Sequence, residues 1–163
     1  MKIILFARHA KSDINHIGAS DFDRTLSLKG ESDAVFMAKI LQKSTYLIQQ
    51  IISSDASRAI ATADKYKNAL TPDKNIQLDH SLYLASHQDI ATVIENTDDA
   101  LSCLMMVGHN PGMTEIVEYS INESFQGMPT CSVAVVGFEA GSWQEITMGS
   151  GQLLDFEYPK KHT

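Results

Sequence analysis

An α/β fold, a three-layer sandwich with a mainly parallel central sheet and helices on both faces, is predicted by two features of the sequence. Apolar strand-like runs alternate with segments of helical period along the chain. One run, 101–107, is almost wholly apolar, as expected of a central strand covered on both sides. The length of 163 residues fits one domain, so we expect a single domain over 1–163 with one active site.

The first half of the chain is expected to form two strand-to-helix units. Residues 2–7 form an apolar run that predicts a buried strand, and 27–43 carries apolar residues at helical spacing behind Ser27, a suitable N-cap. Residues 48–53 predict a second strand, and the chain switches to a helix at Ser54. The inward faces of these two helices are expected to hold Ala34, Met37, Ala38 and Leu41, and then Ala56, Ala59, Ile60 and Ala63.

The second half is expected to continue the alternation and to end in a hairpin. A short strand at 76–78 is followed by a helix around 87–97, the central strand 101–107 and a helix that carries Met113, Ile116 and Val117. Beyond it, 132–138 and 143–148 are predicted to pair as a hairpin that extends one edge of the sheet, joined through Glu139–Ser142.

The charge of the chain excludes several classes of partner. A net charge of -7 argues against nucleic acid and against an anionic membrane, because binding to either needs a basic face. No stretch reaches membrane-spanning length, and Arg8 and His9 interrupt the first apolar run too early for a signal peptide. Cys103 and Cys131 lie far apart in apolar runs, which favours free buried thiols over a metal site. We therefore expect a cytoplasmic protein.

Polar residues follow three of the predicted strands directly. Arg8 and His9 end the first strand, Arg58 follows the second, and His109 follows the central strand. Because ligands of parallel sheets bind outside the carboxyl ends of the strands, these side chains should meet at one rim. Two guanidiniums and two imidazoles together repel one another unless an anion lies between them, and the guanidinium fork matches phosphate oxygens.

The same rim should attract phosphate in a second way. Helix N-termini after 54 and 110 add backbone N–H donors there. Asp55 is better interpreted as a helix-start residue than as a base, and no cluster of acidic residues suggests a magnesium or zinc site. We therefore expect phosphoryl chemistry with His9 as the nucleophile, without a metal or another cofactor.

Each of these residues has an ordinary explanation when it is taken alone. Arg8 and His9 could be solvated residues at a strand end, Arg58 a solvated helix residue and His109 a capping histidine. Their joint spacing is what favours an active site. Ser53, Ser54 and Thr62 are expected to support the helix that carries Arg58, and the remaining motif-free histidines are expected on the surface: His16, His87 and His162.

Taken together, the three junctions resemble the motifs of the histidine phosphatase superfamily. The hallmark Arg-His-Gly/Ala of that family is matched near the N-terminus, its Ser-Ser-x-x-x-Arg-Ala pattern after the second strand, and its Gly-His-Asn pattern after the central strand. The resemblance implies a phosphoglycerate mutase-like fold. The matching segments are Arg8-His9-Ala10, Ser53–Ala59 with Thr62 beyond, and Gly108-His109-Asn110.

Within the superfamily the chain is most similar to the small SixA-type phosphohistidine phosphatases, over nearly its whole length. One departure is Thr25, where the family usually has proline after the arginine that corresponds to Arg24. The segments that carry this resemblance are Arg8–Ser12, Asp23–Leu26, Val107–Gly112 and Pro129-Thr130.

By that resemblance, His9 attacks phosphorus and becomes phosphorylated, and water then hydrolyses the phosphoenzyme. Arg8, Arg58 and His109 would hold the three nonbridging oxygens, and Asn110 and Arg24 would add to substrate binding. Charge stabilisation by these groups would be the main catalytic effect. The implied partner is a phosphorylated protein, such as a histidine phosphotransfer domain of a bacterial signalling pathway.

The proton donor of larger family members is not matched. They place a glutamate after the third strand, where this sequence has His80, a candidate acid that could equally be a rim residue. A placed acid is typically worth roughly 10²–10⁴-fold for an alkoxide leaving group, whereas the imidazole of a phosphohistidine needs less help. The departure therefore favours a phosphohistidine substrate.

Two alternatives stay open on the sequence. A small-molecule phosphomonoesterase of the same superfamily would use the same pocket, and a phosphate-binding module without turnover belongs to a different functional class. The retained His9 argues against the binding module. A mutase is disfavoured because the short chain offers no long insertions to close the site against water.

Overall fold

One mixed sheet of six strands lies at the centre of the protein, in a computed structural model that describes residues 1–15 and 18–163. The strand order across the sheet is β3-β2-β4-β1-β5-β6. The strands are β1 (Lys2–Arg8), β2 (Gln50–Ser53), β3 (Gln77–Leu78), β4 (Cys103–Gly108), β5 (Val133–Phe138) and β6 (Gln152–Glu157).

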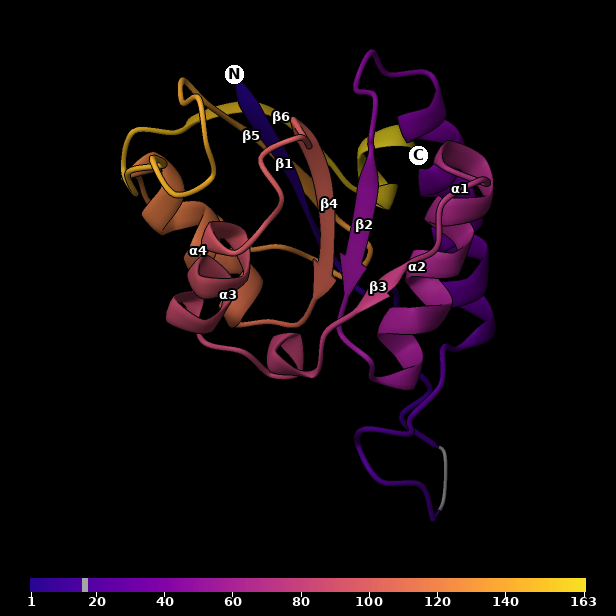
Figure 1. Cartoon of the computed structure of the whole chain (residues 1–163). Helices are drawn as coiled ribbons and strands as arrows, with labels where there is room; N and C mark the ends of the chain where they lie inside the picture. Colours follow the sequence, from indigo (N-terminus) through magenta and orange to yellow (C-terminus); the bar gives the residue numbers. More distant parts are fainter. Residues whose placement is uncertain (16–17) are drawn as a thin grey trace.

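The first four strands are parallel to one another, so the prediction of a mainly parallel sheet is confirmed. Among the last two, β5 runs antiparallel to β1, and β6 runs antiparallel to β5 and therefore in the same direction as the first four. In the register, Arg8 lies opposite Gly108 and Ser53 opposite Val107. The carboxyl ends of β1, β2 and β4 therefore share one edge, towards which the arrowheads of β2 and β4 point in Figure 1.

Helices cover both faces of the sheet, as predicted for a three-layer sandwich. Helices α1 (Leu28–Gln42) and α2 (Ser57–Leu70) pack on one face, and α3 (His87–Glu95) and α4 (Gly112–Ile121) on the other (Figure 1). Two short 3-10 helices, η1 (His80–Leu82) and η2 (Pro159–His162), complete the elements. The predicted N-cap of α1 is confirmed, because the Ser27 side chain accepts a hydrogen bond from the Gly30 N–H.

Alternating side chains of β1 and β4 divide the core into two clusters. Leu5 and Met105 pack under α1 and α2, whereas Phe6 and Met106 pack under α3 and α4. Because both faces of these strands are buried, β4 is apolar without alternation, as its sequence indicated. This double burial fixes the positions of the residues that follow the two strands.

The predicted C-terminal hairpin is wrong in its second strand. The partner of β5 is β6 and not the segment 143–148. Trp143 is fully buried, and its indole N–H donates to the backbone carbonyls of Asp98 and Leu101 at 3.1 and 3.0 Å. This anchor holds the segment against the core as turns, and β6 begins at the edge of the sheet only nine residues after Trp143.

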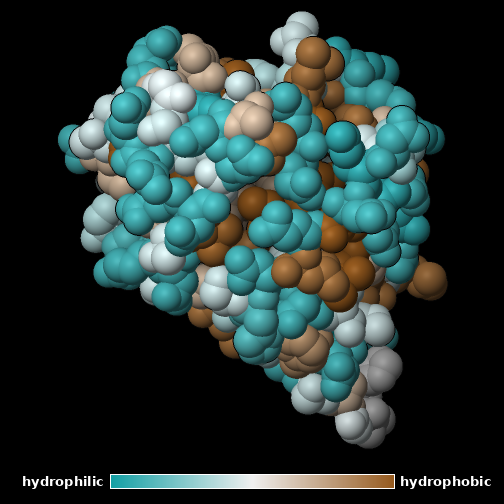
Figure 2. All heavy atoms as spheres, in the orientation of Figure 1, coloured by the Kyte–Doolittle hydropathy of each residue, from teal (hydrophilic) through white to brown (hydrophobic). Residues whose placement is uncertain are grey.

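The surface agrees with the composition. In the orientation of Figure 1 it is largely hydrophilic, with apolar side chains gathered near β2 and β3 (Figure 2). Among the helices of the described residues, none has the length and apolar character needed to cross a membrane. Cys103 and Cys131 are free and buried, which confirms the prediction for both thiols.

Candidate active site

The three polar junctions meet in one pocket of about 400 Å³ at the carboxyl edge of the sheet. Its walls come from the ends of β1 and β4, from α2, and from the loop between β1 and α1, which extends beyond that edge in Figure 1. The lining residues are Arg8, His9, Lys11, Ser12, Ile14, Asp21, Arg24, Arg58, Leu84, His109, Asn110 and Thr130. The fold thus brings together Arg8, His9, Arg24, Arg58, His109 and Asn110, as the sequence predicted, from positions up to a hundred residues apart.

One ring nitrogen of His9, Nδ1, is fixed by a backbone contact, and the other, Nε2, carries the lone pair. Its Nδ1 lies 2.7 Å from the carbonyl oxygen of Ala10, and because a carbonyl can only accept, Nδ1 must carry the proton. The lone pair is then on Nε2. Burial, followed by the charges of Arg58 and Arg8, lowers the pKa of His9 to about 4. At neutral pH the ring is therefore uncharged, with its lone pair on Nε2.

Arg58 lies beside this lone pair. The side chain is 2% exposed, and its Nε is 3.4 Å from His9 Nε2. Thr62, one helical turn further along α2, connects the helix to the end of β1: its hydroxyl donates to the Arg58 carbonyl at 2.8 Å and accepts the Ala10 N–H at 2.9 Å. Thr62 thus has the supporting position expected for it, because it links the backbone next to His9 to the backbone of Arg58.

His109 faces His9 across the pocket, with ring centroids 5.1 Å apart. Its Nε2 is 2.8 Å from the hydroxyl oxygen of Ser54, which also accepts the Ala56 N–H at the start of α2. Burial first, and then the charges of His9 and Arg58, lower the pKa of His109 to about 3. Two neutral imidazoles can therefore lie close together between the arginines without repulsion.

Two donors in the pocket are suited to an anion. Within the described part of the chain, Arg8 Nε and His109 Nδ1 are buried and have no hydrogen-bond partner, although Arg8 Nη1 donates to the Met128 carbonyl at 2.8 Å. When the Ser54 hydroxyl donates to His109 Nε2, Nδ1 carries the ring proton and points to solvent-excluded space. An unpaired buried donor is costly, and both donors are of the kind that binds an oxyanion.

Asp21 is a pocket residue that the sequence analysis missed. Its carboxylate accepts hydrogen bonds from Tyr83 Oη at 2.6 Å, Arg24 Nη2 at 2.8 Å and Arg58 Nη2 at 3.0 Å, and Arg58 Nη1 donates to its backbone carbonyl at 2.6 Å. These donors, Tyr83 first, hold the pKa of Asp21 well below its usual range. Only the spacing of Asp21 three residues before Arg24 could have suggested the pair from sequence.

Asn110 and Arg24 are held by side-chain contacts at the pocket wall. The Asn110 amide donates to the Met128 carbonyl at 2.9 Å, and its oxygen accepts the Thr114 N–H and hydroxyl at 3.2 and 3.0 Å. Arg24 donates to the Ser12 hydroxyl as well as to Asp21. Both residues line the pocket, but Asn110 already uses both ends of its amide.

His80 lies on the rim and not among the residues that line the pocket. Its side chain is 71% exposed, and Nδ1 lies 2.9 Å from the carboxylate of Asp55, which precedes the start of α2 by two residues. Tyr83 stands between His80 and His109: its ring is 5.9 Å from that of His80 and 5.4 Å from that of His109. A role of His80 as an acid stays a prediction.

Of the other histidines expected on the surface, His162 is exposed and His87 is half-buried. His87 stacks on Tyr119 at 3.9 Å between α3 and α4, and His162 contacts the Glu157 carboxylate. His16 lies outside the described residues. Over 1–15 and 18–163, His, Cys, Asp and Glu side chains nowhere form a group of three or more that could hold a metal ion.

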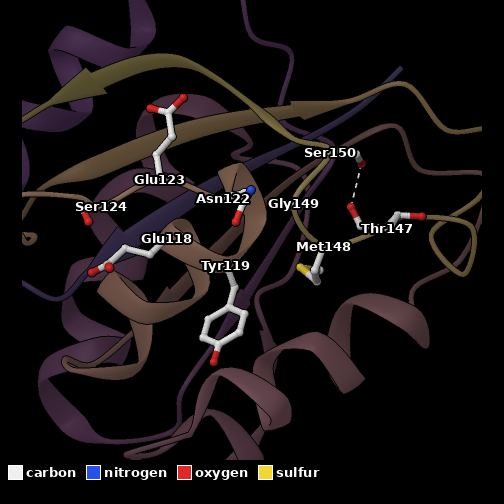
Figure 3. A pocket seen from close by; sticks show the side chains of 9 residues that line it. All are labelled: Glu118, Tyr119, Asn122, Glu123, Ser124, Thr147, Met148, Gly149 and Ser150. Atoms are coloured by element: carbon white, nitrogen blue, oxygen red, sulfur yellow. Dashed lines mark hydrogen bonds between the residues drawn. The ribbon is translucent and has the colours of Figure 1, made fainter.

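A larger hollow, of about 790 Å³, lies elsewhere, between the end of α4 and the loop that precedes β6. Figure 3 shows Glu118 and Glu123 at its wall, with Ser150 donating to the Thr147 carbonyl on the opposite side. Its lining holds two carboxylates and no cationic side chain, so it does not suit a phosphate. The smaller pocket around His9 is therefore the candidate active site because of its cationic side chains and not because of its volume.

Comparison with known proteins agrees with the geometry. Residues 4–83, which include Arg8, His9 and Arg58, match the model of the histidine phosphatase superfamily (branch 1). The SixA protein of Agrobacterium tumefaciens has the same fold, with a TM-score of 0.83 and 27% identity over 97% of this chain and 98% of that one. The chain belongs to the histidine phosphatase superfamily.

Two further proteins are similar to this chain. The protein histidine phosphatase SixA in complex with tungstate shares the fold, with a TM-score of 0.85 and 18% identity over 99% of both chains. An uncharacterised chloroplastic protein of Arabidopsis thaliana is 29% identical over 91% of this chain and 72% of its own length. The fold is phosphoglycerate mutase-like and of the SixA type, and these likenesses support a phosphatase.

Proposed function

We propose that this protein is a metal-independent phosphatase that hydrolyses phosphohistidine on another protein, with residues 1–163 acting as one domain and His9 as the transient phosphate carrier. The observation that carries the proposal is the state of His9: a buried, neutral ring whose Nδ1 is paired with the Ala10 carbonyl and whose Nε2 faces Arg58. A neutral imidazole beside fixed cations is what attack on a phosphoryl group requires.

The reaction would proceed in two displacements at phosphorus. In the first, the lone pair of His9 Nε2 forms a bond to phosphorus while the P–N bond to the substrate imidazole breaks, and that electron pair stays on the leaving nitrogen. Arg8, Arg58 and His109 stabilise the nonbridging oxygens. In the second, the oxygen of water bonds to phosphorus while the P–N bond to His9 breaks. Orthophosphate, which takes up the protons of the water, is released, and the free imidazole of His9 is regenerated.

The choice of substrate rests on the leaving group. The carboxyl group nearest the phosphate site, Asp21, is held ionised by its three donors, and His80 is exposed outside the lining. An alkoxide that leaves without a proton is far less favourable than an imidazole, which leaves neutral or protonated. A phosphoramidate is therefore a better substrate for this pocket than an ordinary phosphate ester.

A substrate displayed on a protein suits the rim of the pocket. Ile14 and Leu84 line the opening and are 82% and 57% exposed, so apolar surface surrounds the polar centre. Such surface is available to pack against a partner protein. A role in a signalling pathway and a cytoplasmic location stay predictions from the sequence.

The decisive experiment follows phosphate release from a phosphorylated histidine phosphotransfer domain in the presence of EDTA, with the wild type and His9→Ala. We expect rapid release by the wild type and release at the background rate by the variant, which should still bind orthophosphate because its arginines remain. Turnover of aryl phosphates but not of the phosphoprotein would instead favour a small-molecule phosphomonoesterase, and inactivity on both would favour a binding module.

A further inference from the structure

The Asp21 carboxylate binds two arginines, Arg58 and Arg24, that are expected to contact the substrate phosphate. Arg58 Nη2 and Arg24 Nη2 donate to its two oxygens at 3.0 and 2.8 Å, and Arg58 Nε lies 3.4 Å from the nucleophilic nitrogen of His9. A guanidinium donates to a carboxylate and to a phosphate with the same fork of N–H groups. A carboxylate and a phosphoryl group therefore compete for these donors.

We propose that Asp21 is an internal competitor for the anion site: a phosphoryl group binds by displacing the Asp21 carboxylate from Arg58 and Arg24, and the carboxylate returns when orthophosphate leaves. The inference rests on the proposed function only in taking orthophosphate as the product. The exchange itself is a binding equilibrium and needs no turnover.

The two partners differ in how freely they can move. The Asp21 side chain is 46% exposed and belongs to the loop between β1 and α1, whereas the Arg58 side chain is 2% exposed and is fixed on α2. The carboxylate can turn into water at little cost, but the guanidinium cannot. The hydrogen bond from Arg58 Nη1 to the Asp21 backbone carbonyl, at 2.6 Å, can keep the loop in place during the exchange.

Asp21 also balances the charge of the pocket. The lining contains four cationic side chains, Arg8, Lys11, Arg24 and Arg58, and Asp21 is its single carboxylate among the described lining residues. With the carboxylate bound, one of the four positive charges is offset before a ligand arrives, which weakens the binding of any small anion. The consequence is selectivity: orthophosphate leaves readily, whereas a phosphoprotein gains further contacts outside the pocket.

The test is calorimetric titration of the full chain with orthophosphate, and with tungstate as a second tetrahedral oxyanion. We expect Asp21→Asn to bind both about tenfold more tightly than the wild type, because an exposed charge-assisted pair no longer has to be broken. Tyr83→Phe keeps the charge but removes the 2.6 Å hydrogen bond to Asp21, so we expect a smaller gain, of about threefold.

The matched control is Asp23→Asn, which removes the same charge from the same loop. Asp23 is exposed and accepts a hydrogen bond from Ser20, with no contact to Arg58 among the hydrogen bonds of the described residues. Its oxyanion affinity should equal that of the wild type. An equal gain in Asp23→Asn would attribute the effect to net charge and overturn the inference, as would unchanged or weaker binding in a folded Asp21→Asn.

Binding and turnover separate this inference from the proposed function. If the protein releases no phosphate from any substrate but Asp21→Asn still binds orthophosphate more tightly, the proposed function fails and the competitor role stands. If the phosphoprotein is hydrolysed but the affinity does not rise in Asp21→Asn, the competitor role fails alone. Thermal unfolding of each variant establishes that it is folded before titration.

Discussion

The strand-end side of the pocket and its loop side are built in different ways. On the strand-end side, His9, Arg58 and His109 are 6, 2 and 3% exposed. The His9 ring is held by the Ala10 carbonyl just after β1, the His109 ring by the Ser54 hydroxyl just after β2, and the Arg58 backbone by the Thr62 hydroxyl on α2. On the loop side, the Asp21 and Arg24 side chains are 46 and 27% exposed; they pair with each other, and Asp21 also accepts hydrogen bonds from Tyr83 and Arg58. Buried groups can define a reaction geometry, whereas exposed pairs can exchange partners with a ligand.

The largest effect should come from the strand-end side. Arg58→Ala removes a buried cation next to His9 Nε2, and we expect kcat on a phosphohistidine substrate to fall by roughly 10²–10³-fold, the usual cost of losing one donor to a developing charge. The matched control is Lys65→Ala, a cation on the same helix that pairs with Glu31 at 3.2 Å outside the pocket. Equal losses in both variants would contradict the special position of Arg58.

The pH dependence of His9 tests the same side without a mutation. Because the folded-state pKa is about 4, the ring should stay neutral, with its proton on Nδ1, down to about pH 5. Titration of the imidazole nitrogens by NMR should show this tautomer and this midpoint. A midpoint near the ordinary histidine value of about 6.5 would mean that burial does not control the nucleophile.

The lowered pKa values also predict how the free energy of unfolding depends on pH. His9 and His109 both have pKa values lowered by burial, so below about pH 6.5 the unfolded chain takes up protons that the folded chain refuses. The free energy of unfolding should therefore decrease as pH falls from about 6.5 to about 4, and denaturant titrations over this range measure it. His109→Gln should flatten the dependence, while a slope unchanged by this variant would place its cause in other groups.

A smaller effect is expected on the loop side. Arg24→Ala removes a half-exposed guanidinium that contacts Ser12 and Asp21, and we expect KM for the phosphoprotein to rise by about fivefold with little change in kcat. Lys29→Ala, which removes an exposed cation paired with Asp33 at 3.1 Å, is the control. A large loss of kcat in Arg24→Ala would show that Arg24 acts in the reaction like the buried residues of the strand-end side.

The smallest effect is expected at the rim. His80→Asn should change kcat on phosphohistidine by less than about threefold, because the ring is exposed and pairs with Asp55. Its effect on an aryl phosphate with a poor leaving group is the sharper measurement. A loss of roughly 10²-fold there, with phosphohistidine turnover retained, would identify His80 as the acid for esters.

Most of the fold could be predicted because strands and helices here follow local apolar patterns. The uninterrupted apolar run of β4 and the helical spacing in α1 required no knowledge of the rest of the chain. The segment 143–148 was misjudged because its apolar residues suggested a strand. Trp143 is instead captured by carbonyls of 98 and 101, which are more than 40 residues away in the chain.

The candidate site likewise contains residues that could be predicted from the sequence and residues that could not. The identities of Arg8, His9, Arg58 and His109 could be predicted because each lies at the end of a strand or within five residues after it, and parallel strands end at one edge. Asp21 could not, because it lies in a loop whose path no local pattern specifies. The same holds for Tyr83, which reaches the pocket from the segment after η1.

The sequence by itself determined the alternation of strands and helices, the edge of the sheet where the chemistry is expected, and the four residues at its centre, because these depend on local periodicity and on the direction of the strands. The tertiary structure alone decided the tautomer of His9, the pairing of Asp21 with Arg58 and Arg24, and the position of His80 on the rim. Each of these depends on distances of a few ångströms between groups from separate elements, and burial then turns those distances into charge states.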